Sequence, residues 1–319
     1  MKLFSNKRRP VHLGPYPLER LERTTVIPGI PSERKPRPVR KRSEPALRFA
    51  EVANDYNDLL DQWQDGTPAK EKAPIAEDPL DLTQQMKAAS YFMDASMVGA
   101  CEIPEAAWFA ETESGETMTP YHGNALVIVV EYVREPEPEN LAAEWLRDAQ
   151  AERAAVRAAE IAVTIAGYIR HLGWHAKSHS ANKSDLDHEL LTVCSGLGRW
   201  QGGQVVNPFL EAGFGTAVVS CDMPVQPDLP LVETPTKPER DWRFQWGVDG
   251  TVPERERERL RQRPSHWSQH PMETIRKVPR PTTLVLEDEV PRVPKRAAFF
   301  ERARKGDLGA KTQVERNRF

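Results

Sequence analysis

The hydrophobic and polar positions along the chain predict a central region that mixes strands and helices. Residues 125–132 form a continuous apolar run rich in β-branched side chains, which is typical of a strand covered on both faces. Residues 215–220 predict a second strand. Residues 174–180 alternate in character and predict a third, with His175, Lys177 and His179 on one side.

Three stretches have helical spacing. Residues 44–63 carry one apolar row, made of Leu47, Val52, Tyr56, Leu59 and Trp63. A second helix is expected to begin near Asp81, which can cap it, and to end near Gly99. Its stripe, which we interpret as core, consists of Leu82, Met86, Ala89, Met93 and Met97. The longest helix spans residues 141–172, capped by Asn140 and stopped by Gly173.

Proline and charge divide the chain into three parts. Residues 1–80 and 236–319 hold 19 of the 28 prolines, which excludes long helices and central strands from much of both segments. Residues 1–45 carry 12 Lys and Arg against 4 Asp and Glu, and residues 236–319 carry 20 against 13. The acidic middle, residues 46–235, carries 12 against 30. We therefore expect basic arms that wrap their own acidic core or bind an acidic partner.

The arms contain anchors rather than low-complexity sequence. The N-terminal arm has six apolar residues that could dock on a surface: Leu13, Tyr16, Leu18, Leu21, Val26 and Ile30. The C-terminal segment has aromatic anchors that suit docking on the core or on another subunit: Trp242, Phe244, Trp246, Trp267, Phe299 and Phe300.

Several classes of protein are excluded. No run of about 18 apolar residues exists, so no membrane span is expected. The acidic middle would oppose a nucleic-acid duplex, and no reading motif is present. Cys101, Cys194 and Cys221 stand far apart and match no close metal-binding spacing, which indicates free thiols in a reducing, cytoplasmic environment.

Two candidate sites remain in residues 161–231. His171, His175 and His179 could bind a metal only if they converged from two elements, because Gly173 separates them; polar surface positions without a metal are preferred. Ser, His and Asp residues cluster in residues 179–189, where a solvated loop is the default interpretation. Gly196, Gly198, Gly202 and Gly203 would let backbone N–H groups approach a phosphate or cofactor, although no Walker or dinucleotide motif is present.

The order of these motifs resembles the core of the corrinoid-dependent reductive dehalogenases, which are related to epoxyqueuosine reductase. The resemblance covers residues 81–235 and rests on three segments: Tyr168, Arg170, Leu172 and Gly173 in the first, Gly196, Leu197 and Gly198 in the turn, and Asp222, Pro224 and Asp228 at the strand end. The chain departs from the family pattern at Arg199, Trp200, Gln201 and Gly202, and it has no cysteine beyond Cys221, where the family has cysteine clusters.

The resemblance implies an α+β fold, with a nitroreductase-like core at residues 81–235, an N-terminal arm and short helix at 1–80, and a C-terminal wrapping segment at 236–319. It also implies cobalamin as cofactor. Tyr168 and Arg170 are the candidate catalytic groups, because they could supply a proton donor and a cation, respectively; the alternative is that they pack and solvate the helix end. The expected cofactor-binding residues are Gly196, Leu197, Gly198, Gly202, Gly203, Asn207 and Ser220. No iron–sulfur cluster is expected in this chain, because the cysteine ligands are missing.

Three functions follow from this interpretation. The first is a corrinoid-binding module that removes halide from an organohalide with electrons from another polypeptide. The second is a corrinoid-free scaffold or dimerisation subunit that works with a cysteine-rich catalytic partner, as a homo- or heterodimer. The third is a flavin nitroreductase relative, which the lack of a basic phosphate-binding cluster disfavours.

Overall fold

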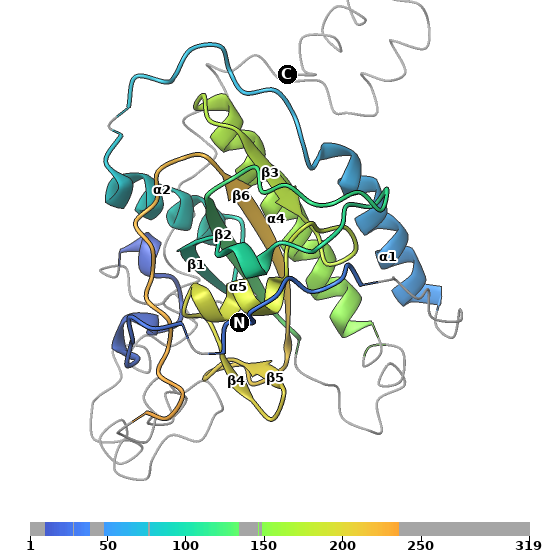
Figure 1. The fold of residues 1–319 in the computed structure, drawn as a ribbon, viewed down its shortest axis with the longest axis vertical. Coiled ribbons are helices and arrows are strands. Elements are labelled where there is room, and N and C mark those ends of the chain that lie inside the picture. Colours follow the sequence, from blue (N-terminus) through green and yellow to red (C-terminus); the bar gives the residue numbers. More distant parts are fainter. Residues whose placement is uncertain are drawn as a thin grey trace, which may run out of the picture. The chain divides into compact units, whose positions relative to one another are not determined.

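The computed structural model describes residues 10–27, 29–38, 48–75, 77–133, 146 and 149–235. A four-stranded antiparallel sheet forms the centre of this part of the chain (Figure 1). Its strands lie in the order β1 (Met97–Glu102), β2 (Asn124–Glu131), β6 (Phe214–Cys221) and β3 (Ala176–His179). Helices accompany this sheet, and the predicted α+β class is confirmed.

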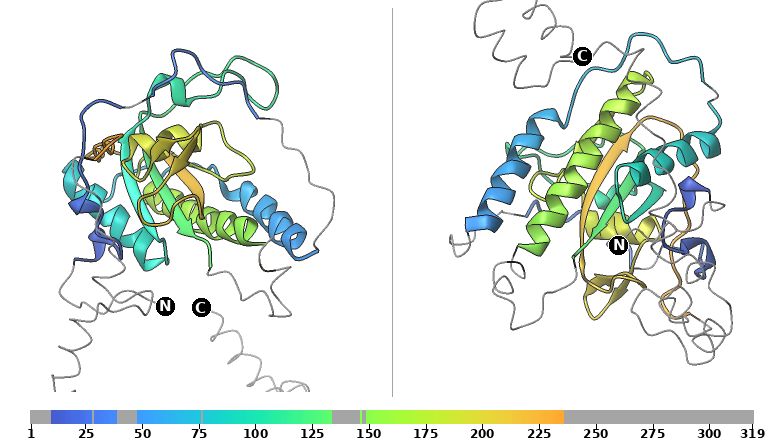
Figure 2. Two further views of the ribbon diagram at one scale, coloured as in Figure 1. Left: turned by 90° about the horizontal axis from the view of Figure 1, so that it is seen from below. Right: turned by 180° about the vertical axis from the view of Figure 1, so that it is seen from behind.

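Helices α2 (Pro79–Phe92) and α4 (Gln150–His171) cover one face of the sheet (Figure 2). Every second side chain of the strands points to this face. The buried cluster there joins strand residues Val98, Leu126, Ile128 and Val219 to helix residues Leu82, Met86, Ile161, Ile165 and Ile169. The interpretation of the Leu82–Met86 stripe as core is confirmed for these two residues.

The opposite face of the sheet is covered by helix α5 (His188–Cys194) and by the N-terminal arm. The second buried cluster joins strand residues Met97, Val127, Val129 and Val218 to Leu190, Leu191, Trp108, Phe209 and Tyr16. A short hairpin of β4 (Arg199–Gln201) and β5 (Gln204–Val206) follows α5. None of the described helices is both long and apolar enough to cross a membrane.

The N-terminal arm docks on the core through some of the predicted anchors. It includes two short 3₁₀ turns, Val11–Leu13 and Leu18–Arg20. Tyr16 is 3% exposed, and its hydroxyl donates to the carboxylate of Glu131 on β2. Leu18 and Leu21 pack against the same cluster. The prediction is wrong for Val26 and Ile30, which are 70% and 45% exposed. The C-terminal anchors in residues 236–319 lie outside the described residues.

The second predicted helix begins earlier and ends earlier than expected. Asp78, not Asp81, caps α2: its carboxylate accepts from the backbone N–H groups of Leu80 and Asp81. Pro79 can follow directly because its missing N–H would have no helical partner there. The helix ends at Phe92, and the chain turns at Asp94, which has φ 69°.

Strand β1 was missed because its apolar run continues the helical stripe. Met97 and Gly99, assigned to the helix from the sequence, belong to β1. Gly99 does not stop a helix; a Cβ at this position would lie 2.7 Å from the carbonyl oxygen of Ser195. The glycine therefore allows the α5 end to approach the strand closely.

The end of the longest helix is confirmed. Gly173 has φ 99°, which favours glycine, and its N–H donates to the carbonyl of Arg170 at 3.0 Å. The predicted cap Asn140 and the start at residue 141 lie outside the described residues.

The helix predicted for residues 44–63 is confirmed as α1 (Arg48–Leu60), followed by a 3₁₀ turn, Asp61–Trp63. α1 packs beside α4, at the margin of the helical layer (Figure 2). Its apolar row does not enter the core: Val52 is 65% exposed and Trp63 is 67% exposed. Leu47, the first member of the predicted row, lies outside the described residues.

Candidate functional site

The space beside the turn after α5 is occupied by other parts of the chain. Asp187 caps the start of α5, and the helix ends at Cys194 with Ser195 as its C-cap; Gly196, with φ 65°, follows in the turn. The Arg23 guanidinium donates to the carbonyls of Gly196 at 2.8 Å and Leu229 at 2.7 Å. A Cβ on Gly196 would lie 1.8 Å from Arg23 Nη1 and 2.2 Å from the Leu229 oxygen. The space that this glycine provides is therefore occupied by the arm and by the segment after β6.

The other predicted cofactor residues near this turn, Leu197, Gly198 and Asn207, also contact the protein's own core. A Cβ on Gly198 would lie 2.6 Å from Val205 Cγ1, and Leu197 is 1% exposed in the core. Asn207 is 1% exposed; its amide donates to the Leu197 carbonyl, and its Oδ1 accepts from two backbone N–H groups of the following turn. Asn207 thus ties the α5 turn to the segment after β5.

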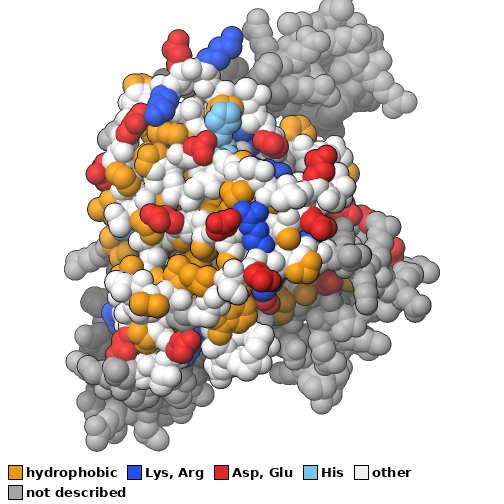
Figure 3. Space-filling view, viewed as in Figure 1, with side chains coloured by type: hydrophobic (Ala, Val, Ile, Leu, Met, Phe, Trp, Pro, Cys, Tyr) orange, Lys and Arg blue, Asp and Glu red, His pale blue; other side chains and the backbone are white. Residues whose placement is uncertain are grey.

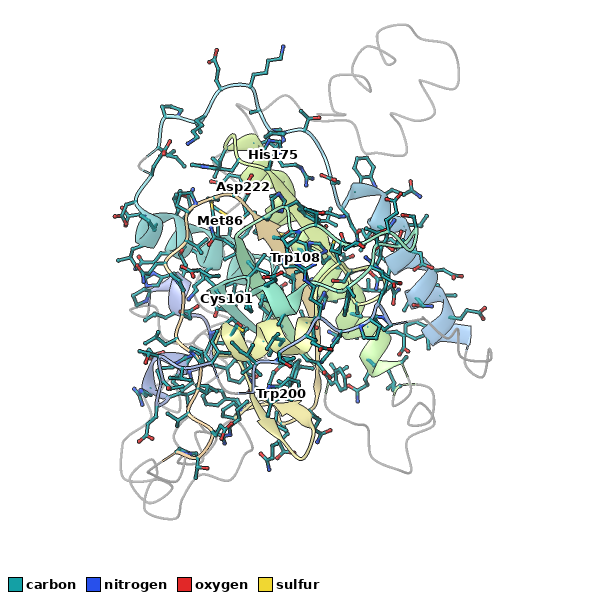
Figure 4. All side chains as sticks on the ribbon, in the orientation of Figure 1. Met86, Cys101, Trp108, His175, Trp200 and Asp222 are labelled. Atoms are coloured by element: carbon teal, nitrogen blue, oxygen red, sulfur yellow. The ribbon has the colours of Figure 1, made fainter. Side chains whose placement is uncertain are left out.

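Gly202 and Gly203 form the tip of the β4–β5 hairpin. Their φ values are 61° and 85°, as a two-residue hairpin turn requires, and a Cβ on either would meet nothing within 4 Å. Trp200 of β4 lies against the N-terminal arm, with the ring centroid 5.6 Å from Lys35 Nζ. Figure 4 shows Trp200 at the opposite end of the fold from His175.

Ser220, the last predicted cofactor residue, is buried in a chain of hydrogen bonds. His179 Nδ1 accepts from the backbone N–H of Asp185 at 3.3 Å, so its Nε2–H donates to Ser220 Oγ at 2.9 Å. Ser220 Oγ lies 2.8 Å from His122 Nδ1, which can accept the hydroxyl proton. Burial lowers the pKa of His179 well below its ordinary value, so this imidazole is neutral.

The prediction that the histidines are polar surface residues is therefore wrong for His179. It is 0% exposed, although the strand alternation placed it with exposed His175. Residues 176–179 form an edge strand, but the cluster of residues 179–189 folds over its end. Within the described residues, no group of three His, Cys, Asp or Glu side chains could hold a metal ion.

Asp185 is the centre of a polar cluster that the sequence did not reveal. Its carboxylate accepts from Tyr121 Oη at 2.7 Å, from Lys177 Nζ at 2.7 Å, and from the Arg37 guanidinium. Burial alone would raise the pKa of Asp185, but these three hydrogen bonds lower it below its ordinary range. Burial, and then the bond to Asp185, raise the pKa of Tyr121, so this phenol stays protonated.

Two cavities border this cluster. One, of about 730 Å³, lies between the arm residues Lys35–Pro38 and the start of α5, and includes His188 and Thr216. The other, of about 550 Å³, is lined by Tyr121, Lys177 and His179 among others. Both have the size of small-molecule pockets. None of the predicted cofactor residues lines either of them.

His188 is held neutral at the edge of the larger cavity. Its Nδ1 lies 3.1 Å from Thr216 Oγ1 and its Nε2 lies 3.1 Å from Ser184 Oγ. Burial lowers its pKa to about 4. A neutral imidazole between two hydroxyls, with no carboxylate bonded to it, has a structural role in this geometry rather than that of a catalytic base.

The two candidate catalytic residues lie on α4 and line neither of the two cavities. Tyr168 accepts a hydrogen bond from Gln85 Nε2 at 2.5 Å, which joins α4 to α2. Arg170 donates to the carbonyls of Gln64 at 3.2 Å and Ala176 at 2.9 Å. These contacts fasten the segment after α1 to the start of β3.

Comparison with models of protein families and with curated proteins gives no match. Solved structures do match. Catabolic reductive dehalogenase NpRdhA is 38% identical over 100% of this chain, with a TM-score of 0.67, and the match covers 44% of that protein. A reductive dehalogenase whose structure suggests a mechanism for B12-dependent dehalogenation is 36% identical over 95% of this chain, with a TM-score of 0.66 and 42% of that protein covered. The chain belongs to the reductive dehalogenase family.

This reductive dehalogenase family chain spans less than half the length of the relatives it matches. NpRdhA has also been solved in complex with 3-bromo-4-hydroxybenzoic acid, with the same 44% coverage. Epoxyqueuosine reductase from Bacillus subtilis matches at 11% identity with a TM-score of 0.36, values too low to support an inference about this chain.

Proposed function

We propose that this chain is a corrinoid-free structural module of a reductive dehalogenase. In this proposal, halide removal takes place on a separate catalytic module that carries the corrinoid and the iron–sulfur clusters, either in another polypeptide or elsewhere in a longer one. The observation that carries the proposal is the occupied turn at Gly196: the Arg23 guanidinium and the Leu229 carbonyl fill the space beside it.

The residues present do not fit the corrinoid that relatives use. A cofactor-cradling turn needs backbone N–H groups that face open space. Here the N–H of Gly196 donates to Val193 at 3.0 Å, and the N–H groups of Leu197 and Gly198 both donate to Thr192, at 3.0 and 3.2 Å. Asn207 and Ser220 have their side chains committed to internal bonds. In this proposal, no chemical step takes place on a corrinoid bound to this chain.

Electron delivery also belongs elsewhere in this proposal. The sequence has three cysteines, fewer than the four thiolates of an ordinary cluster. All three are buried, and burial raises the pKa of Cys194 and Cys221 to about 12. At a finer level than the α+β class, we propose that the core is nitroreductase-like. The antiparallel sheet, with α2 and α4 on one face, supports this.

Reconstitution with hydroxocobalamin tests the proposal. The chain is incubated with excess hydroxocobalamin under reducing conditions, desalted, and measured by absorbance, with an authentic corrinoid-loaded reductive dehalogenase as the positive control. We expect no retained corrinoid absorbance. Retention of about one corrinoid per chain would overturn the proposal in favour of a corrinoid-binding module that draws electrons from a partner.

A further inference from the structure

A segment of the N-terminal arm, residues 34–38, lies along the larger cavity. Figure 1 shows it in dark blue, in front of α5. Its three basic residues, Arg34, Lys35 and Arg37, are half-buried, whereas both of its prolines are exposed. Lys35–Pro38 line the cavity of about 730 Å³. This segment, the strap, therefore faces the core with charged side chains rather than apolar ones.

Every basic side chain of the strap forms an ion pair with the core. Arg34 Nη2 lies 2.7 Å from Glu105 Oε1, and Lys35 Nζ lies 2.6 Å from Asp187 Oδ2. The Arg37 guanidinium pairs with the carboxylate of Asp185. Figure 3 shows basic side chains lying beside acidic ones on the described face of the molecule drawn there. Pairing of opposite charges thus holds the strap in place.

The two guanidinium groups also bond to backbone carbonyls. Arg34 donates to Met118 at 2.7 Å. Arg37 donates to Ser184 at 2.7 Å and to Glu111 at 3.1 Å. These carbonyls belong to segments on two sides of the cavity, so the strap joins them by polar contacts alone.

The backbone of the strap has one link to the core. Among the described residues, a single backbone–backbone hydrogen bond joins the two, from the Ala110 N–H to the Lys35 carbonyl at 2.8 Å. The preceding Phe109 N–H donates instead to the Asp185 carbonyl, at 3.0 Å. Two neighbouring amides therefore differ in whether their hydrogen bond depends on the strap.

The part of the arm that precedes the strap is held differently. Tyr16 is 3% exposed, and Leu18 and Leu21 pack against the buried cluster on the α5 side of the sheet. The Thr24 N–H donates to the Pro230 carbonyl at 2.9 Å. Neither buried cluster of the described residues contains a strap residue. A segment with few buried apolar contacts opens at a lower free-energy cost than one anchored in a core.

We propose that the strap opens as one unit while residues 13–24 stay docked, and that it is a lid on the larger cavity. Opening removes the wall that Lys35–Pro38 form. The Phe109 ring, whose centroid lies 5.8 Å from Arg37 Cζ, then loses its guanidinium cover. Salt screens exposed ion pairs, so ionic strength favours the open form. The proposal depends on contacts between arm and core, and not on whether the chain binds a corrinoid.

Amide hydrogen exchange of the full chain, resolved by residue with NMR, tests the proposal. We expect the Ala110 amide to exchange at least about tenfold faster than the Phe109 amide, because it requires only the strap to open. Raising the NaCl concentration from about 0.05 M to about 0.5 M should speed exchange at Ala110 about threefold and leave Phe109 and Thr24 unchanged.

Two variants test whether the strap opens as a unit. Lys35→Gln removes one ion pair of the strap and should speed exchange at Ala110 about fivefold. Arg34→Gln removes another, at a side chain that does not bond to Ala110, and should speed the same exchange about two- to fivefold. The matched control is Lys72→Gln, which removes an ion pair with Glu77 outside the strap and should change nothing at Ala110.

Three results would overturn the proposal. Equal exchange at Ala110 and Phe109, independent of salt, would show that the strap is a fixed part of the core. Faster exchange at Ala110 in Lys35→Gln but not in Arg34→Gln would mean that strap residues detach singly. Faster exchange at Thr24 together with Ala110 would mean that the whole arm leaves. Unchanged exchange of the β2 amides confirms that each variant is folded.

Discussion

Alanine at Gly196 is expected to destabilise the chain much more than alanine at Gly202. Both glycines have positive φ, 65° and 61°, so the cost of holding an L residue there is similar. They differ in their surroundings: a Cβ at Gly196 would lie 1.8 Å from Arg23 Nη1 and 2.2 Å from the Leu229 oxygen, whereas one at Gly202 meets nothing within 4 Å. The pair separates backbone strain from the docking of the arm.

The expected magnitudes follow from these distances. A left-handed conformation costs an alanine about 1–2 kcal/mol at either position. At Gly196 the Arg23 side chain must also move away, which removes hydrogen bonds to two carbonyls, a loss of roughly 1–3 kcal/mol for a charged donor. The Leu229 backbone must shift as well. We expect about 3–5 kcal/mol in total for Gly196→Ala against about 1–2 kcal/mol for Gly202→Ala.

Urea titration followed by circular dichroism measures both values. Arg23→Ala serves as a third variant, because it removes the same hydrogen bonds without adding a Cβ at the turn. Its cost is expected to fall between the other two. Equal destabilisation by Gly196→Ala and Gly202→Ala would refute the reasoning, since it would mean that the space beside Gly196 is open.

Two further predictions concern the buried polar groups. Asp185→Asn leaves Lys177 and Arg37 without their carboxylate, and we expect urea denaturation to show that the free energy of unfolding falls by about 2–4 kcal/mol. The control is Glu105→Gln, at an ion pair with Arg34 whose carboxylate side chain is 80% exposed; this variant should change the free energy of unfolding little. The folded-state pKa of His188, about 4, lies below its ordinary 6.5. Its contribution to stability is therefore complete above pH 6.5 and is lost as the pH falls toward 4, by roughly 3 kcal/mol. His188→Gln should flatten that slope in thermal melts, and exposed His171→Gln should not; an unchanged slope in His188→Gln would contradict the assignment.

Local patterns were sufficient to predict much of the fold. The apolar run of β2 and the glycine stop of α4 depend on neighbouring residues, and both were found where expected. β1 was not, because Met97 fits a helical stripe as well as a buried strand. A turn at Asp94, a non-glycine residue with φ 69°, gives no reliable signal in the sequence.

The polar cluster could not be predicted because its members are far apart in sequence. Arg37, Tyr121 and Lys177 meet at Asp185 from three separate segments. The available signal was the Asp and His content of residues 179–189, which was interpreted as a solvated loop. The glycine turn shows the opposite error: a turn with free space beside Gly196 was predicted, but what fills that space depends on Arg23, 173 positions away.

Backbone groups on both edge strands of the sheet, β1 and β3, are paired with other parts of the chain. On β1, the Val98 N–H donates to Tyr91 Oη at 3.0 Å, and Ala100 exchanges hydrogen bonds with Asp228, giving its N–H to the carboxylate at 2.7 Å and accepting the Asp228 N–H at 2.8 Å. On β3, the Ser178 N–H donates to the Gln64 carbonyl at 2.9 Å. Unpaired edge groups template aggregation and strand exchange between chains. Because these groups of β1 and β3 are already paired within the described residues, they cannot bind a further strand, which protects these positions against edge-to-edge aggregation.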